Sequence, residues 1–104
     1  MIDASDFRNK KISSLTIKYE WDGSLHSAFI SVVDNEGVES TFKISGLTEC
    51  SIYEDFGSTY ISNCKVLETE NGLYICLDPY DELSCVADLE KDSMWFIGST
   101  LVKQ

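Results

Sequence analysis

The 104-residue sequence predicts an all-β fold, either an antiparallel sandwich or a partly open barrel of about seven strands. Three observations support this prediction. Apolar residues recur at every second position through most of the chain, turn-forming residues separate these segments at short intervals, and a helical period is almost absent. A chain of this length is expected to form a single domain over residues 1–104.

Each predicted strand either alternates in polarity or is apolar throughout. The predicted strands cover residues 15–21, 25–33, 38–44, 50–53, 60–68, 73–77 and 94–102. The first strand has apolar residues at every odd position from Leu15 to Trp21, so that face is expected to be buried. The last strand is apolar on both faces and is therefore expected to lie in the centre of a sheet.

Turn-forming residues predict where these strands reverse. Asp22-Gly23 and Asn71-Gly72 favour hairpins because both residues of each pair tolerate a positive φ, and residues 34–37 predict another turn. Pro79 ends the preceding strand, since proline cannot donate to a central ladder. Residues 81–92 carry no strand pattern and are expected to hold a loop or one short helix.

Charge is the strongest indication of function in this sequence. Eighteen acidic residues against eight basic ones give a net charge of −10, and residues 44–92 alone hold eleven acidic and two basic residues. Such a field repels nucleic-acid phosphates and anionic membranes and attracts basic partners. We therefore expect a basic protein partner, with no direct contact to nucleic acid or membrane. The alternative is that the acidity serves only solubility.

The four cysteines are expected to be free thiols. Cys50, Cys64, Cys76 and Cys85 lack the close pairs that structural zinc sites use. The N-terminus lacks the basic-then-apolar order of a signal peptide, and no apolar run approaches the roughly 20 residues of a membrane-spanning helix. These features predict a cytoplasmic protein, and disulfides are rare in that compartment.

The sequence offers little for catalysis. His26 is the only histidine, and no cysteine lies near it in the sequence. Known nucleophile-elbow, phosphate-loop, dinucleotide-binding and zinc-protease motifs are missing. Asp78, Asp81 and Glu82 lack the ligand spacing and central glycine of an EF-hand loop. We therefore expect no catalytic residues, no metal site and no cofactor.

Most aromatic residues, Trp21 included, are expected to belong to the core or the sheets. Phe56 and Tyr80 differ because each lies in an acidic turn, and an exposed ring among carboxylates has the composition of a protein-binding hot spot. The alternative, in which both rings fold inward and cap the sheet, stays open. The predicted partner-binding residues are acidic and aromatic residues of the segment with net negative charge: Glu49, Glu54, Asp55, Phe56, Asp78, Tyr80, Asp81, Glu82 and Asp88.

The segment ISGLTECSIYEDFGSTYISNCKVLETENGLYICLDPYDE, residues 44–82, resembles small immunity proteins of bacterial toxin–immunity loci, in particular those of contact-dependent growth inhibition systems. Such proteins are small, cytosolic, often acidic and often β-rich, and each neutralises a cognate toxin domain, frequently a nuclease. The resemblance implies a non-enzymatic immunity protein that binds a basic toxin, such as an RNase or DNase domain. A structural or housekeeping β domain is the alternative, and a small enzyme of unknown type is the third hypothesis.

Overall fold

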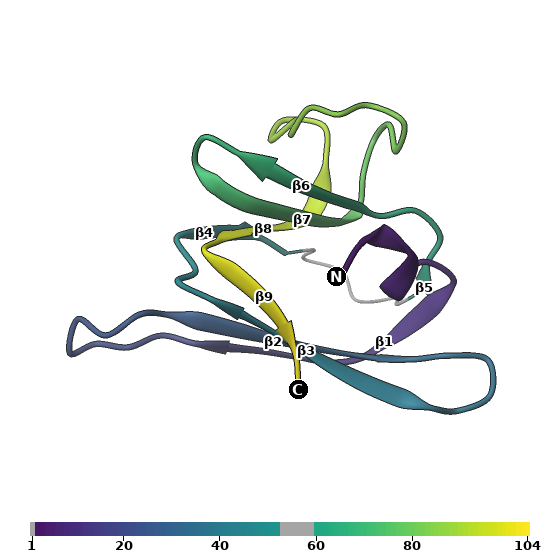
Figure 1. Cartoon of the computed structure of the whole chain (residues 1–104), viewed down its shortest axis with the longest axis horizontal. Helices are drawn as coiled ribbons and strands as arrows, with labels where there is room; N and C mark the ends of the chain where they lie inside the picture. Colours follow the sequence, from purple (N-terminus) through teal and green to yellow (C-terminus); the bar gives the residue numbers. More distant parts are fainter. Residues whose placement is uncertain (1, 53–59) are drawn as a thin grey trace.

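The computed structural model describes residues 2–52 and 60–104, which form nine strands in two antiparallel sheets (Figure 1). The strands are β1 Lys10–Lys18, β2 Ser27–Val33, β3 Glu39–Ser45, β4 Glu49–Ser51, β5 Tyr60–Ile61, β6 Lys65–Thr69, β7 Gly72–Asp78, β8 Ser93–Gly98 and β9 Thr100–Lys103. One sheet has the order β5-β1-β2-β3-β9 and curls into a half-barrel, and the other has the order β4-β8-β7-β6. The predicted all-β, antiparallel fold is confirmed.

Two predicted strands are each divided between the sheets, which is why the structure has more strands than expected. The strand predicted over residues 60–68 leaves the five-stranded sheet after Ile61 as β5 and continues in the four-stranded sheet as β6. The strand predicted over residues 94–102 is divided into β8 and β9 after Gly98, where a Cβ would come within 2.5 Å of the Ile44 side chain. The predicted central position is right for β8 and wrong for β9, which is an edge strand.

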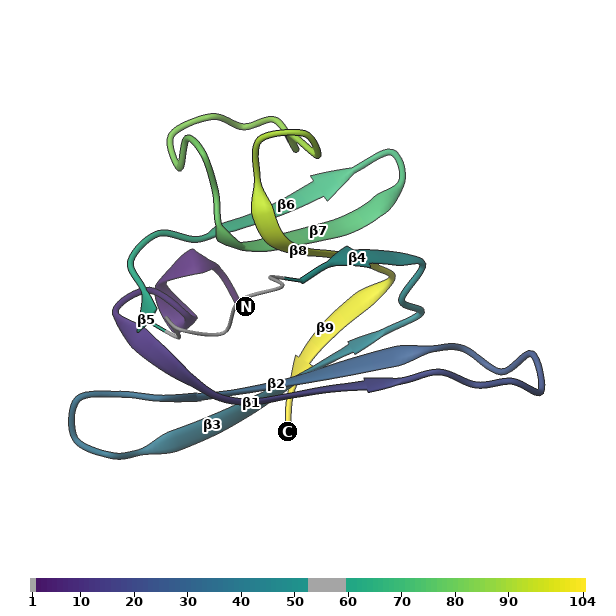
Figure 2. The same ribbon diagram turned by 180° about the vertical axis from the view of Figure 1, so that it is seen from behind.

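The hydrophobic core lies between the two sheets. Its buried side chains come mainly from β2 and β3 on one side and from β7 and β8 on the other: Ala28, Ile30, Val32, Phe42, Ile44, Ile75, Leu77, Met94 and Phe96. A single 3-10 turn, η1 (Ala4–Asp6), is capped by the Asp3 side chain and lies between the sheets near β5 (Figure 2). This turn places the fully buried Phe7 ring against the ring of Phe42, with 4.6 Å between their centroids.

The first hairpin extends beyond the core. The strand predicted over residues 15–21 is displaced toward the N-terminus, because β1 ends at Lys18 and residues 19–26 form a loop at the tip of a projecting hairpin (Figure 1). Tyr19 and Trp21, which we expected to be buried, are 76% and 89% exposed. The alternation of residues 15–21 correctly predicts a strand as far as Lys18. Beyond Lys18 the hairpin has no facing sheet against which its apolar side chains could pack.

Residues 79–92 form a succession of turns, so the alternative of a short helix in this segment is wrong. The side chains of Asp81, Ser84 and Asp88 accept hydrogen bonds from backbone N–H groups two or three residues further along the chain. Such bonds offer the backbone a local alternative to the helical pattern.

The hairpin predicted at Asn71-Gly72 is present, but its loop begins one residue earlier. Thr69 pairs with Gly72, so the loop consists of Glu70 and Asn71, and Gly72 is the first residue of β7. Gly72 has a φ of +122°, and a Cβ at this position would meet the carbonyl oxygen of Gly98 at 2.6 Å. The glycine is therefore required by both backbone conformation and space.

Replacing Gly72 by valine should lower the free energy of unfolding by about 3 kcal/mol, because backbone strain of about 1–3 kcal/mol adds to the clash with Gly98. Equilibrium urea denaturation measures this loss. Gly23→Val is the matched control, since Gly23 also has a positive φ, +89°, but a Cβ there would meet no atom within 4 Å. Equal losses in the two variants would contradict the close approach to Gly98.

Candidate functional site

Five of the predicted binding residues lie together at the end of β7 and in the loop that follows it. They are Asp78, Tyr80, Asp81, Glu82 and Asp88. The structure places these five in one continuous segment beside the four-stranded sheet (Figure 1).

The other four predicted residues do not join this group. Glu49 lies on β4 opposite Ile97, whereas Asp78 lies opposite Ser93, so the two carboxylates stand near opposite ends of β8. Glu54, Asp55 and Phe56 lie outside the described residues.

The loop of residues 79–92 covers the outer face of the four-stranded sheet (Figure 1). This face carries a second buried apolar cluster, against which Ala87 of the loop and Leu67 pack: Tyr74, Cys76, Trp95 and Ile97. The indole N–H of Trp95 is buried without an acceptor among the described residues. Ala87 therefore packs the loop against this face of the sheet.

The buried carboxylate of Asp92 holds the backbone of the loop of residues 79–92 in place. It has no solvent exposure and accepts hydrogen bonds from the Tyr74 hydroxyl at 2.6 Å, the Tyr80 backbone N–H at 2.8 Å and the Asp88 backbone N–H at 3.2 Å. The Asp92 N–H in turn donates to the Asp88 carbonyl at 2.8 Å. One side chain thus fixes the beginning and the end of the loop.

Lys65, the first residue of β6, completes this network. Its Nζ lies 3.3 Å from the Asp92 carboxylate and donates to the Val86 carbonyl at 2.9 Å, and its side chain is only 2% exposed. Removing one member of a buried ion pair leaves an uncompensated charge, which is strongly unfavourable. The pair therefore ties the middle of the loop to the sheet.

The surroundings of Asp92 favour its charged form. Burial by itself would raise the pKa of this carboxyl, but hydrogen bonds from Tyr74, Tyr80 and Asp88, together with the charge of Lys65, hold it below its ordinary value. Burial, and then the hydrogen bond to Asp92, raise the pKa of the Tyr74 phenol. Tyr74 is therefore a protonated donor and Asp92 an ionised acceptor at neutral pH.

The outer side of the loop is both acidic and apolar. We define the loop surface as the solvent-facing side chains of Asp78, Tyr80, Asp81, Leu83, Val86, Asp88, Leu89 and Glu90. Leu83 is 91% exposed, Tyr80 71% and Val86 65%. The Tyr80 ring therefore does not fold inward. Large apolar side chains grouped among carboxylates are typical of protein-binding surfaces.

Two of the predicted residues already have cationic neighbours. Glu82 forms an ion pair with Arg8, whose Nε donates to it at 2.6 Å, so Glu82 joins the loop to the N-terminal region. The Nζ of Lys91 lies 5.0 Å from the centroid of the Tyr80 ring. The carboxylates of Asp81, Asp88 and Glu90, by contrast, have no ion-pair partner among residues 2–52 and 60–104.

Sequence reasoning missed the apolar part of this surface and the network beneath it. Leu83 and Val86 follow no strand period, and their position in an acidic segment was the only signal that could have marked them. Nothing in the sequence distinguishes Asp92 from the other acidic residues. Its role depends on Lys65 and Tyr74, which are distant in the chain.

The described residues hold no group suited to metal binding, and two of the four thiols are buried. No group of three or more His, Cys, Asp or Glu side chains among them could hold a metal ion. The four cysteines are free thiols, as predicted. Burial raises the pKa of Cys64 to about 12 and that of Cys76 to about 11, so neither is a ready nucleophile.

The comparisons with known proteins add no family. The sequence matches no protein-family model, and searches of curated proteins and of solved structures found no similar protein. Within the part of the chain that the structure describes, no helix is long and apolar enough to cross a membrane. The loop surface therefore has to be interpreted from its own chemistry.

Replacing Asp92 by asparagine should lower the free energy of unfolding by about 3–5 kcal/mol, because the buried Lys65 charge loses its partner. Urea denaturation of the single variant measures this loss. The double variant Lys65→Met with Asp92→Asn removes both charges and should recover part of it. A loss below about 1 kcal/mol in the single variant would show that the network does not hold the loop.

The lowered pKa of Asp92 predicts a specific dependence on pH. Its contribution to stability is fully present above the ordinary carboxyl pKa of 3.8 and is lost as the pH falls through the lower folded-state value. The difference in unfolding free energy between the wild type and Asp92→Asn should therefore be constant near neutral pH and shrink below about pH 4. A difference that stays constant down to pH 2 would contradict this assignment.

Proposed function

We propose that the protein is an immunity-type inhibitor that binds a basic toxin domain and covers its active site with the loop surface. The observation that supports this proposal is the combination of exposed apolar side chains and carboxylates on a loop held by a buried ion pair. The resemblance of residues 44–82 to immunity proteins of contact-dependent growth inhibition systems points to the same class of partner.

The apolar side chains supply a reason for tight binding. Leu83, Val86 and Tyr80 are largely exposed in the free protein, and burying them against a partner would remove apolar surface from water. Association usually also costs free energy to order the contacting segments. The Lys65–Asp92 network has already ordered the backbone of this loop, so that cost is reduced.

The carboxylates supply a reason for selecting a basic partner. Residues 78–92 hold six acidic residues and one lysine. Arg8 pairs with Glu82 and Lys65 with Asp92. The other four acidic residues belong to the loop surface, where Asp78, Asp81 and Glu90 are exposed and Asp88 is half-buried. Such a group speeds the encounter with a positively charged protein. If the partner is a nuclease, these carboxylates would bind the positive surface with which the nuclease holds nucleic-acid phosphates.

The alternative function, a structural or housekeeping β domain that is acidic for solubility, accounts for the carboxylates alone. Solubility gives no reason to expose Leu83, Val86 and Leu89 on one loop, because exposed apolar groups promote association. This contrast favours the binding function. No described feature favours the third hypothesis, an enzyme.

A triple variant tests the proposal directly. Asp81→Asn, Asp88→Asn and Glu90→Gln remove three charges but keep the side-chain oxygens that accept hydrogen bonds in the loop. The probe is a basic C-terminal domain of a large secreted protein, where a neighbouring gene encodes one. The association rate at low salt should fall about tenfold or more, and its dependence on ionic strength should weaken.

The matched control removes the same number of charges elsewhere. Asp22→Asn, Glu36→Gln and Glu39→Gln lie in the five-stranded sheet and its hairpins, and both triple variants change the net charge from −10 to −7. The control should keep nearly the wild-type rate. An equal fall in association rate in both triple variants would show that only the total charge matters. The absence of any basic partner domain would favour the solubility alternative.

A further inference from the structure

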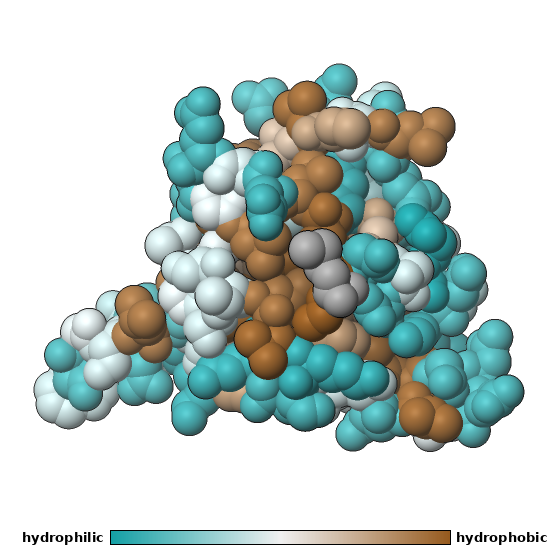
Figure 3. Space-filling view, viewed as in Figure 1, coloured by the Kyte–Doolittle hydropathy of each residue, from teal (hydrophilic) through white to brown (hydrophobic). Residues whose placement is uncertain are grey.

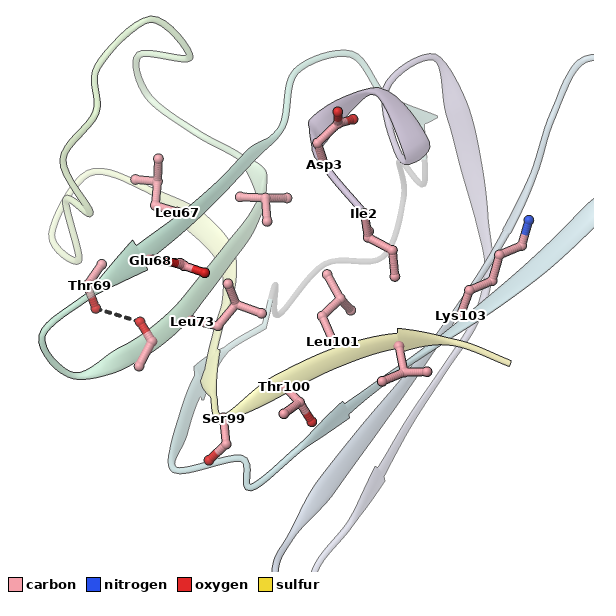
Figure 4. A pocket seen from close by; sticks show the side chains of 13 residues that line it. Ile2, Asp3, Leu67, Glu68, Thr69, Leu73, Ser99, Thr100, Leu101 and Lys103 are labelled. Atoms are coloured by element: carbon pink, nitrogen blue, oxygen red, sulfur yellow. Dashed lines mark hydrogen bonds between the residues drawn. The ribbon is translucent and has the colours of Figure 1, made fainter.

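A groove opens between the edges of the two sheets, on the face shown in Figure 3. It has a volume of about 1020 Å³, and in Figure 3 a hydrophobic band runs through this region between the loop above and the five-stranded sheet below. Ile2, Leu73 and Leu101 point into the groove from three separate segments (Figure 4). Val66 also lines it, so its interior is largely apolar.

The groove runs along the edges of two strands and does not lie on the face of either. Residues 66–69 of β6 and residues 99–103 at β9 all line it without a gap. Side chains of a strand alternate between its two faces, so a cavity on one face would contact every second residue. Contact with consecutive residues places the groove beside the backbone itself. Among the described residues, β6 and β9 each pair on one side only.

The hydrogen bonds of β9 show which of its backbone groups face the groove. The Gln104 N–H donates to the Thr41 carbonyl at 2.8 Å, and the register places Val102 opposite Lys43. Because hydrogen-bonded positions alternate along an antiparallel pair, Val102 also directs its backbone groups toward β3. Leu101 and Lys103 therefore direct their N–H and C=O groups away from β3, toward the open side.

We infer that this groove binds an extended segment of a partner chain, which adds to the five-stranded sheet beside β9. The added strand would pair with the outward backbone groups of Leu101 and Lys103 and place every second side chain over the apolar interior. Strand addition of this kind draws affinity from main-chain hydrogen bonds and specificity from pockets for alternate side chains. The groove is a surface separate from the loop surface, and binding there does not depend on the proposed inhibitor function.

Charge identifies the partner as a basic chain, distinct from a second copy of this one. Two copies would each bring a net charge of −10 to the contact. Glu68 on β6 and Asp3 at the N-terminal turn lie at the groove, and Lys103 stands at the end of β9. A segment in which apolar residues alternate with lysine or arginine would bury its apolar side chains and bring a cation toward Glu68.

The test uses the full chain labelled with ¹⁵N and a short peptide of alternating valine and lysine, blocked at both ends. In the free protein the Leu101 and Lys103 amides should exchange with solvent much faster than those of Val102 and Gln104, which pair with β3. Adding the peptide should shift the Leu101 and Lys103 resonances and slow their exchange. This measurement on the wild type does not depend on whether any variant folds.

Two substitutions of Lys103 distinguish the contribution of its backbone N–H to peptide binding from that of its side-chain charge. Lys103→Pro removes the outward N–H, and an edge strand tolerates proline on its open side. It should weaken peptide binding about tenfold, the effect of losing one hydrogen bond of about 1.4 kcal/mol. Lys103→Gln keeps the N–H and removes a cation that faces a basic peptide, so it should bind at least as tightly as the wild type.

Three outcomes would overturn the inference. The first is the absence of any shift at Leu101 and Lys103, or shifts confined to residues 78–92. The second is protection of Leu101 in the free protein that rises with protein concentration, which would identify a second copy as the occupant. The third is that a peptide of alternating valine and glutamate binds as tightly as the valine–lysine peptide, which would contradict the inference that the partner is basic.

Discussion

A buried ion pair between Lys65 and Asp92 determines how the loop of residues 79–92 lies on the four-stranded sheet. Removing two charges from water costs several kcal/mol per ion, and such a pair persists only when further hydrogen bonds satisfy it. Tyr74, Tyr80 and Asp88 provide these bonds to Asp92, and the Val86 carbonyl provides one to Lys65. The consequence is a long irregular loop with a defined position on the sheet, so the exposed side chains of its outer side keep a fixed arrangement.

The two sheets close around one core but leave their edges apart. The chain passes from one sheet to the other between β3 and β4, between β5 and β6 and again at Gly98, and these crossings hold the sheets together. Between β6 and β9 the described chain provides no further strand, and an apolar groove remains. The loop surface is fixed by a polar network and the groove by the sheet topology, so the two surfaces have independent physical origins and can be tested separately.

Alternating polarity and turn residues predicted most strands because both depend on neighbouring residues. Gly72 shows how far such local reasoning goes: the need for a positive φ was correct, but the position of the loop was displaced by one residue. Trp21 shows where it fails, because alternation cannot indicate whether a facing sheet reaches that end of the strand. The role of Asp92 was equally hidden, since its partner Lys65 is 27 residues away and only the folded chain brings them together. The acidic character of the site was visible in the sequence, and its apolar residues and its anchor were not.

The central claim, that Asp92 orders the loop surface, is tested most directly by amide hydrogen exchange at Tyr80 and Asp88 in the free protein. Both N–H groups donate to the buried carboxylate, so they should exchange only as fast as the protein opens as a whole. In Asp92→Ala both should exchange at rates typical of a flexible loop while the amides of β7 and β8 stay protected. Fast exchange at Tyr80 and Asp88 in the wild type, or protection that is unchanged in the variant, would contradict the claim.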